Sequence, residues 1–114
     1  MPNENLNTSA NLNTSESLNI RHLRAFREVA RCKSVSLAAK NAHLSQPAVT
    51  QAIGNLSKTL GVVLFERRSD GMFVSEIGAA FLDRVDRALE HLKIGARETA
   101  RLGQRQQGAG FAHF

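Results

Sequence analysis

The segment from Ser45 to Leu60, SQPAVTQAIGNLSKTL, constrains the possible folds more than any other part of the chain. Its apolar residues recur at i, i+4, i+7 and i+11, which gathers them into one narrow stripe of an α-helix. These residues are Val49, Ile53, Leu56 and Leu60. The opposite side collects Pro47, Gln51, Gly54, Asn55 and Lys58, with Thr50 on its flank. The pattern predicts a helix with one buried side and one slim, polar, almost uncharged side.

Two residues specify where this helix begins. Ser45 is a favourable N-cap because its hydroxyl can accept a hydrogen bond from a free backbone N–H. Pro47 falls in the first turn, where a missing N–H costs nothing. A capped helix with amide side chains and no bulky outer group has the shape to enter the major groove of DNA. An ordinary amphipathic surface helix would show the same pattern, so the segment alone leaves both interpretations open.

Two further helices are expected upstream of Ser45. An apolar face that includes Leu23, Phe26 and Val29 predicts the first, at about 21–32. Ser36 is the better N-cap for a short second helix at 37–42. Because only His43 and Leu44 separate that helix from Ser45, the pair predicts a helix-turn-helix motif at about 35–54.

A β-hairpin is expected after Gly61, a residue suited to ending a helix. Two apolar runs, 62–65 and 72–74, flank a polar turn that contains Asp70-Gly71. Beside a helix-turn-helix, such a hairpin is a wing, and Arg67 and Arg68 are its candidate contacts with phosphates or the minor groove. A solvated turn would also account for the two arginines.

A long helix is predicted over 76–102, with Ser75 as its cap. At about 1.5 Å per residue it would extend about 40 Å, too far to bury its apolar stripe on so small a domain. The surplus stripe is expected to pair with the same helix of a second chain. The candidate dimerisation residues are Phe81, Val85, Ala88, Leu89, Leu92 and Ala96.

Composition limits the classes of function. Residues 1–17 are rich in Asn, Ser and Thr and predict a disordered tail, while 103–114 predict a flexible hinge or tail. All 15 basic residues follow the N-terminal tail, which favours a polyanionic partner. With no secretion signal, no membrane-spanning run and one cysteine, we expect a cytoplasmic protein without disulfides. Nothing clusters as a metal site or catalytic constellation, so neither a cofactor nor enzymatic activity is expected.

Four motifs resemble the N-terminal domain of LysR-type transcriptional regulators: RHLRAFREVA, SVSLAAKNAHLSQPAVTQAI, LGVVLFER and VSEIGAAF. The resemblance implies a mainly α fold, a winged helix-turn-helix (three-helix core plus β-hairpin wing) over 18–75, followed by a dimerisation and linker helix. It also implies binding to palindromic promoter sites as a homodimer or a dimer of dimers. The residues Ser45, Gln46, Pro47, Ala48 and Thr50 correspond to the groove-entering turn, and Arg67 to the wing contact.

The chain departs from the family pattern in informative ways. Gln51 stands where arginine is frequent, Ala52 where glutamine is usual, and Ser57 where glutamate is usual. Since Gln pairs best with adenine and Arg with guanine, the base facing Gln51 is expected to be adenine. The family normally continues into a two-lobed effector-binding domain that is absent here, which suggests either a truncated product or a regulator without a ligand sensor.

The leading hypothesis is a sequence-specific, dimeric DNA-binding transcriptional regulator, for which RNA polymerase is a further candidate partner. The predicted DNA-binding residues are Ser36, Ser45, Gln46, Pro47, Ala48, Thr50, Gln51, Asn55, Lys58, Arg67 and Arg68. Salt-dependent affinity is also expected from Arg21, Arg24 and Lys40. The alternative is an interaction protein that forms inactive heterodimers with full-length relatives through the long helix.

Overall fold

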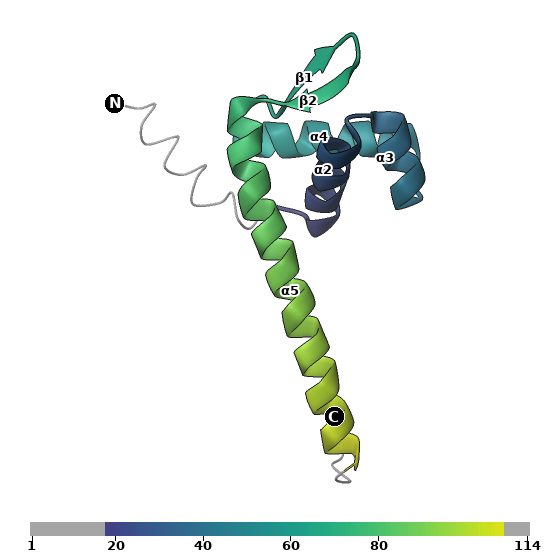
Figure 1. Cartoon of the computed structure of the whole chain (residues 1–114), viewed down its shortest axis with the longest axis vertical. Helices are drawn as coiled ribbons and strands as arrows, with labels where there is room; N and C mark the ends of the chain where they lie inside the picture. Colours follow the sequence, from purple (N-terminus) through teal and green to yellow (C-terminus); the bar gives the residue numbers. More distant parts are fainter. Residues whose placement is uncertain (1–17, 109–114) are drawn as a thin grey trace, which may run out of the picture. The chain divides into compact units, whose positions relative to one another are not determined.

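The computed structural model describes residues 18–108. Its elements are α2 (Ile20–Cys32), α3 (Val35–Ala42), α4 (Gln46–Leu60), β1 (Phe65–Arg68), β2 (Gly71–Val74) and α5 (Glu76–Gly108) (Figure 1). The expected mainly helical fold with a two-stranded hairpin is confirmed. The chain divides into two units, one ending at Leu82 and one beginning at Asp83, and each is described by itself. The predicted tail at 1–17 and the end of the predicted hinge, 109–114, lie outside the described residues.

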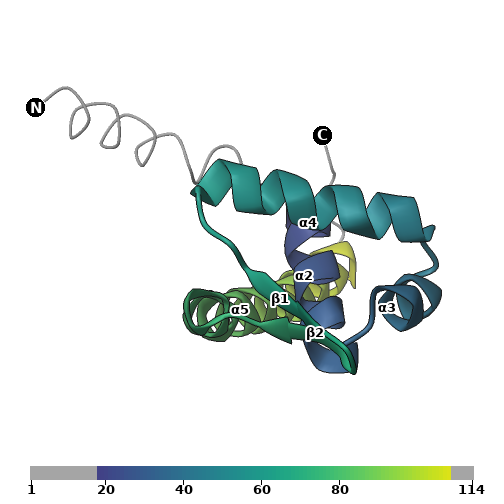
Figure 2. The same ribbon diagram turned by 90° about the horizontal axis from the view of Figure 1, so that it is seen from above.

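The first unit is built on the three helices α2, α3 and α4, which surround a small core (Figure 2). Phe26, Val29 and Val49 are fully buried there. Ala38 and Ala39 of α3 are buried in the same region, and their small side chains allow the helices to approach closely. The apolar periodicity of α2 and α4 therefore packs as the sequence predicts.

Helix α4 has the predicted start, end and buried side. The Ser45 hydroxyl accepts a hydrogen bond from the Ala48 N–H at 3.1 Å. Gly61 ends the helix in the left-handed conformation, with φ at 72°. Val49 and Leu56 are buried, as expected, and Ala52 is buried beside them, which widens the predicted stripe.

Helix α3 begins earlier than predicted, and Ser34, not Ser36, caps it. The Ser34 hydroxyl accepts from the Leu37 N–H at 3.1 Å, whereas Ser36 lies inside the first turn. The physical reason is the residue before it: Lys33 takes the left-handed conformation that ends α2, with φ at 56°. One extended residue then suffices to start the next helix, so the prediction of Ser36 as the cap was wrong.

The first strand of the hairpin lies further along the chain than predicted, while the second lies close to its predicted position. Strands β1 and β2 pair antiparallel, with Arg67 opposite Met72 and Arg68 opposite Gly71. The apolar residues before β1 connect α4 to the hairpin without forming a strand, since Leu64 is buried and Val63 is exposed. Arg67 and Arg68 therefore belong to a strand, where neighbouring side chains point to opposite faces.

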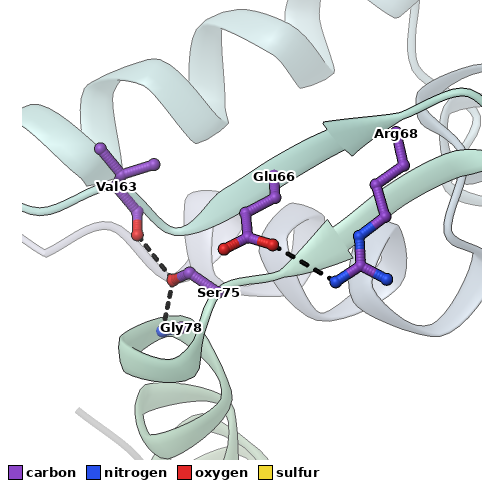
Figure 3. A network of polar contacts seen from close by, with 5 residues as sticks. All are labelled: Val63, Glu66, Arg68, Ser75 and Gly78. Atoms are coloured by element: carbon purple, nitrogen blue, oxygen red, sulfur yellow. Dashed lines mark hydrogen bonds and ion pairs between the residues drawn. The ribbon is translucent and has the colours of Figure 1, made fainter.

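The start of α5 is fastened to the hairpin in the first unit (Figure 3). The Ser75 hydroxyl donates to the Val63 carbonyl at 2.7 Å and accepts from the Gly78 N–H at 2.9 Å, which confirms the predicted cap. A side chain at Gly78 would collide with the Leu64 carbonyl. Phe81 packs on Phe26, with ring centroids 5.6 Å apart. Phe81 is thus part of the core of the first unit, although the sequence had suggested a role in dimerisation.

The second unit consists of the remainder of α5, which continues to Gly108, beyond the predicted end at residue 102. Glutamine is a good helix former, so the glutamine-rich stretch can extend the helix despite its glycines. Asp83 and Arg87, one helical turn apart, form an ion pair at 3.2 Å. Within residues 18–108, no helix is both long enough and apolar enough to cross a membrane.

Candidate nucleic-acid interface

A hollow of about 500 Å³ in the first unit lies where the starts of α3 and α4 meet the hairpin. We call it the wing hollow. Its walls include five of the predicted DNA-binding residues: Ser36, Gln46, Thr50, Arg67 and Arg68. These residues are spread over more than 30 positions of sequence. The fold therefore brings these polar residues together. The sequence alone linked the hairpin arginines to the helix-turn-helix only by analogy.

The outer face of α4 is open to solvent. The predicted contact residues exposed there are Ser45, Gln46, Pro47, Thr50, Gln51, Asn55 and Lys58. Ala48 is half-buried, and its N–H is already bonded to the Ser45 hydroxyl. No acidic residue occupies the first turn of α4, so the positive end of the helix dipole is unopposed. A phosphate or the acceptor edge of a base is the natural partner for such a face.

The two wing arginines differ in what surrounds them. Arg68 pairs with Glu66 at 3.3 Å (Figure 3), and its guanidinium lies 4.6 Å from the centre of the Phe73 ring. Arg67 is on the other face of the strand, which is also the face of Phe65 and Met72. Since those two apolar residues pack against the helical core, Arg67 is directed to the helix side of the wing. No ion pair involving Arg67 occurs within residues 18–108.

The wing is held in place by Lys33, a residue that the sequence did not indicate. The Met72 N–H donates to the Lys33 carbonyl at 3.0 Å. Gly71 allows this approach, because a Cβ there would lie 2.6 Å from the same carbonyl oxygen and its φ is 145°. The Lys33 ammonium lies 5.5 Å from the centre of the Phe73 ring. The Asp-Gly pair signalled a turn, but nothing in the sequence signalled that the turn would dock on the end of α2.

Three other predicted phosphate contacts are not part of the wing hollow. Arg21 and Arg24 lie in the first turns of α2, whereas Lys33, which lines the wing hollow, follows its last turn. At about 1.5 Å per residue, Arg21 and Lys33 are about 18 Å apart along the helix. Lys40 is exposed in the last turn of α3 and also lines no part of this hollow.

Cys32 shows no sign of reactivity. Burial raises the pKa of its thiol, and the neighbouring Glu28 carboxylate raises that pKa further. A raised pKa leaves less of the nucleophilic thiolate at neutral pH. Within the described part of the chain, no group of His, Cys, Asp and Glu is arranged to hold a metal ion.

Comparison with known proteins assigns this arrangement to one family. The model described as "Bacterial regulatory helix-turn-helix protein, lysR family" matches residues 20–79. The HTH-type transcriptional regulator PcaQ of Agrobacterium fabrum is 44% identical over 87 residues, which are 73% of this chain and 28% of PcaQ. TfdS of Cupriavidus pinatubonensis is 46% identical over 70 residues, 61% of this chain and 24% of TfdS. The chain thus spans less than a third of the length of these curated relatives.

Solved structures agree with the sequence comparison. The DNA-binding domain of BenM, in complex with catB site 1 DNA, superposes with a TM-score of 0.73 at 29% identity, covering 75% of this chain and 97% of that one. Full-length CbnR in complex with its target DNA gives a TM-score of 0.66 at 38% identity, covering 73% of this chain and 29% of that one. On the matched model, the relatives and the shared fold, this chain belongs to the LysR family of bacterial regulatory helix-turn-helix proteins.

Proposed function

We propose that this chain acts as a sequence-specific, dimeric DNA-binding transcriptional regulator, with the outer face of α4 in the major groove of its promoter site. The observation that carries the proposal is the wing hollow, which gathers Gln46 and Thr50 of α4 together with Arg67 of β1. All three side chains are exposed to solvent. The BenM domain and CbnR were both solved in complex with DNA, which supports the same partner here.

The chemistry of the interface divides between its two parts. On α4, the amides of Gln46 and Gln51 can donate to and accept from base edges, with a preference of Gln for adenine. The wing supplies charge through Arg67, which suits a phosphate or a narrow minor groove. Lys58 is the only basic residue of α4, so most of the affinity for phosphates has to come from outside that helix.

Two measurements on the full chain test the DNA proposal. An unbiased selection of binding sites is expected to yield a two-fold symmetric site with adenine at the position facing Gln51. If each of two subunits neutralises four phosphates, the slope of log K against log salt is expected near −7, at roughly 0.9 per contact. A slope near zero, or a fixed guanine opposite Gln51, would contradict the proposed mode of binding.

The dimer is proposed from the second unit. A mostly apolar hollow of about 670 Å³ on α5 is lined by Ala88, His91, Leu92, Gly95, Ala96 and Thr99. Leu92 is 58% exposed, an unfavourable state for a large apolar side chain unless another surface covers it. Val85 and Leu89 are buried in the single chain. The proposed contact with a second copy therefore centres on Ala88, Leu92 and Ala96.

The same exposed stripe supports a second candidate function, an interaction protein that forms inactive heterodimers with full-length relatives. The two functions need different residues. Interference with a full-length relative would be lost in Leu92→Glu but retained in Gln51→Ala and Arg67→Ala. A regulator acting through its own DNA site would lose its effect in all three variants.

A further inference from the structure

A second hollow in the first unit lies apart from the candidate DNA interface and has a different character. It has a volume of about 350 Å³ and lies between α2 and the end of α3. Its polar rim is formed by Arg21, Arg24, Arg27 and Glu28, and its apolar part includes Ala42 and Leu44. We call it the arginine hollow. It shares no lining residue with the wing hollow.

The one carboxylate that lines the arginine hollow, that of Glu28, is hydrogen-bonded to residues other than the arginines. The Glu28 carboxylate accepts a hydrogen bond from the Asn41 amide at 3.2 Å and one from the Cys32 thiol at 3.5 Å. The ion pairs formed within residues 18–108 are Arg68 with Glu66 and Arg87 with Asp83. None of the three arginines of this hollow is therefore neutralised by a described carboxylate.

Arg27 shows most directly that an acceptor is missing. Its Nε is buried and has no hydrogen-bond partner within the described part of the chain. A buried donor on a charged group that is left without an acceptor is destabilising, and such groups are rare in folded proteins. Because the Arg27 Nε is itself enclosed, a carboxylate from outside the chain would pair with the exposed Arg21 and Arg24, and could bond one guanidinium through two parallel N–H···O bonds.

Leu44 gives the hollow an apolar contact on a fixed turn. Its N–H donates to the Ala39 carbonyl at 2.9 Å, and His43 before it takes the left-handed conformation, with φ at 58°. Although its backbone is held by this hydrogen bond, the Leu44 side chain remains 47% exposed. A rigid, exposed leucine beside unpaired arginines is typical of a surface that binds a partner containing both acidic and apolar side chains.

We propose that the arginine hollow binds a short acidic segment of a partner protein, in which carboxylates flank an apolar side chain. The carboxylates pair with Arg21 and Arg24, and the apolar side chain covers Leu44. A volume of about 350 Å³ has room for a few side chains only, at the low end of ligand sites, which suits a short segment. A DNA phosphate would pair with the arginines but would leave Leu44 uncovered. The hollow also lies at the opposite end of α2 from the wing hollow.

The experiment uses the full chain and a fluorescein-labelled peptide, acetyl-EDELLDEE-amide, with binding followed by fluorescence anisotropy. We expect binding that weakens about tenfold in Arg24→Glu, because a paired charge is replaced by a repelling one. Arg24→Gln, which only removes the charge, and Leu44→Ala are expected to weaken it less. The matched control is Arg84→Glu, an exposed charge reversal at a residue that does not line the hollow. The amide peptide QNQLLNQQ is expected not to bind.

Each contrary result overturns the proposal. Equal losses of peptide affinity in Arg24→Glu and Arg84→Glu would show that the effect arises from net charge and not from the hollow. Binding of the amide peptide as strong as that of the acidic one would exclude carboxylate recognition. A gain in peptide affinity in the double variant Glu4→Gln, Glu16→Gln would assign the hollow to the chain's own N-terminal segment.

The proposal is independent of the proposed DNA binding, and the two are separable in the same experiment. Arg67→Ala is expected to weaken DNA binding and leave peptide binding unchanged, whereas Leu44→Ala is expected to weaken peptide binding and leave DNA binding unchanged. A lower DNA affinity in Arg24→Glu together with a salt slope reduced by about 1 per subunit would show a phosphate contact in the hollow and overturn the proposal.

Discussion

At the scale of single residues, Gly54 has no role that the protein itself requires. A Cβ at this position would meet no atom within 4 Å, and the residue lies on the exposed face of α4. Glycine in the middle of a helix costs about 1 kcal/mol relative to alanine. The sequence placed Gly54 on the outer, polar face of this helix. In the structure, no neighbouring atom limits the size of the side chain at this position, so any such limit has to come from a partner.

We therefore predict that Gly54→Ala separates stability from DNA affinity. The variant should unfold about 4–8 °C higher, because it recovers about 1 kcal/mol of helix propensity. Its affinity for the selected DNA site should fall, since the added methyl group lies where the duplex approaches the backbone. Gly103→Ala, whose Cβ also meets nothing within 4 Å, is the matched control and should keep its DNA affinity. Unchanged DNA affinity in Gly54→Ala would show that the duplex does not approach the backbone of α4 closely at this position.

The two wing arginines give the second prediction at this scale. Arg67→Ala is expected to weaken DNA binding about tenfold, equivalent to about 1.4 kcal/mol, and to reduce the salt slope. Arg68→Ala should weaken it less, because Arg68 is already paired with Glu66 and stacked on Phe73. Titration of labelled DNA at several salt concentrations measures both effects. A larger loss in Arg68→Ala would mean that the pair with Glu66 breaks on binding.

At the scale of elements, the sequence predicted the helices of the first unit better than their junctions. Apolar periodicity identifies α2 and α4 because their buried stripes run over three or more turns. The start of α3 was misplaced because the sequence favoured Ser36 as the cap, whereas the left-handed Lys33 selects Ser34. The hairpin was shifted because its start is set by tertiary contacts of Leu64 and Phe65 with the core, which β propensity does not reveal.

The choice between the two serines can be measured. Ser34→Ala is expected to lower the free energy of unfolding by about 1 kcal/mol, because the Leu37 N–H loses its acceptor. Ser36→Ala, exposed in the first turn, should change it by less than about 0.5 kcal/mol. Urea unfolding followed by circular dichroism measures both. Equal losses would indicate that the two hydroxyls, 3.1 Å apart, stabilise the start of α3 jointly.

The docking of the wing supplies a further prediction for this element. Gly71→Ala places a Cβ 2.6 Å from the Lys33 carbonyl oxygen and requires alanine to adopt a φ of 145°. The hairpin has to move away from α2, so the hydrogen bond from Met72 to Lys33 is lost. We expect weaker DNA binding with little loss of helical circular dichroism. Retention of full affinity would show that the position of the wing is unimportant for DNA binding.

At the scale of the whole molecule, the proposed self-association rests on the surplus apolar surface of α5. Leu92 and Leu102 are both more than half exposed, and Leu92 lines the apolar hollow on that helix. The sequence predicted this surplus from length alone, but it could not tell which members of the stripe are buried in the single chain. Val85 and Leu89 are buried there, whereas Ala88 and Ala96 are exposed beside Leu92. The exposed residues Ala88, Leu92 and Ala96 are therefore the ones to test as contacts between copies.

Leu92→Glu is accordingly expected to convert a dimer into a monomer, because a carboxylate in the contact would be buried without a partner. Analytical ultracentrifugation measures the change in mass. Affinity for a two-fold symmetric site should fall steeply, while affinity for an isolated half-site should change little, since the wing hollow belongs to the first unit alone. Arg101→Glu, an exposed charge change on the same helix, is the control. If Leu92→Glu remains a dimer, the contact between copies lies on another surface, and the exposed stripe of α5 needs a different occupant.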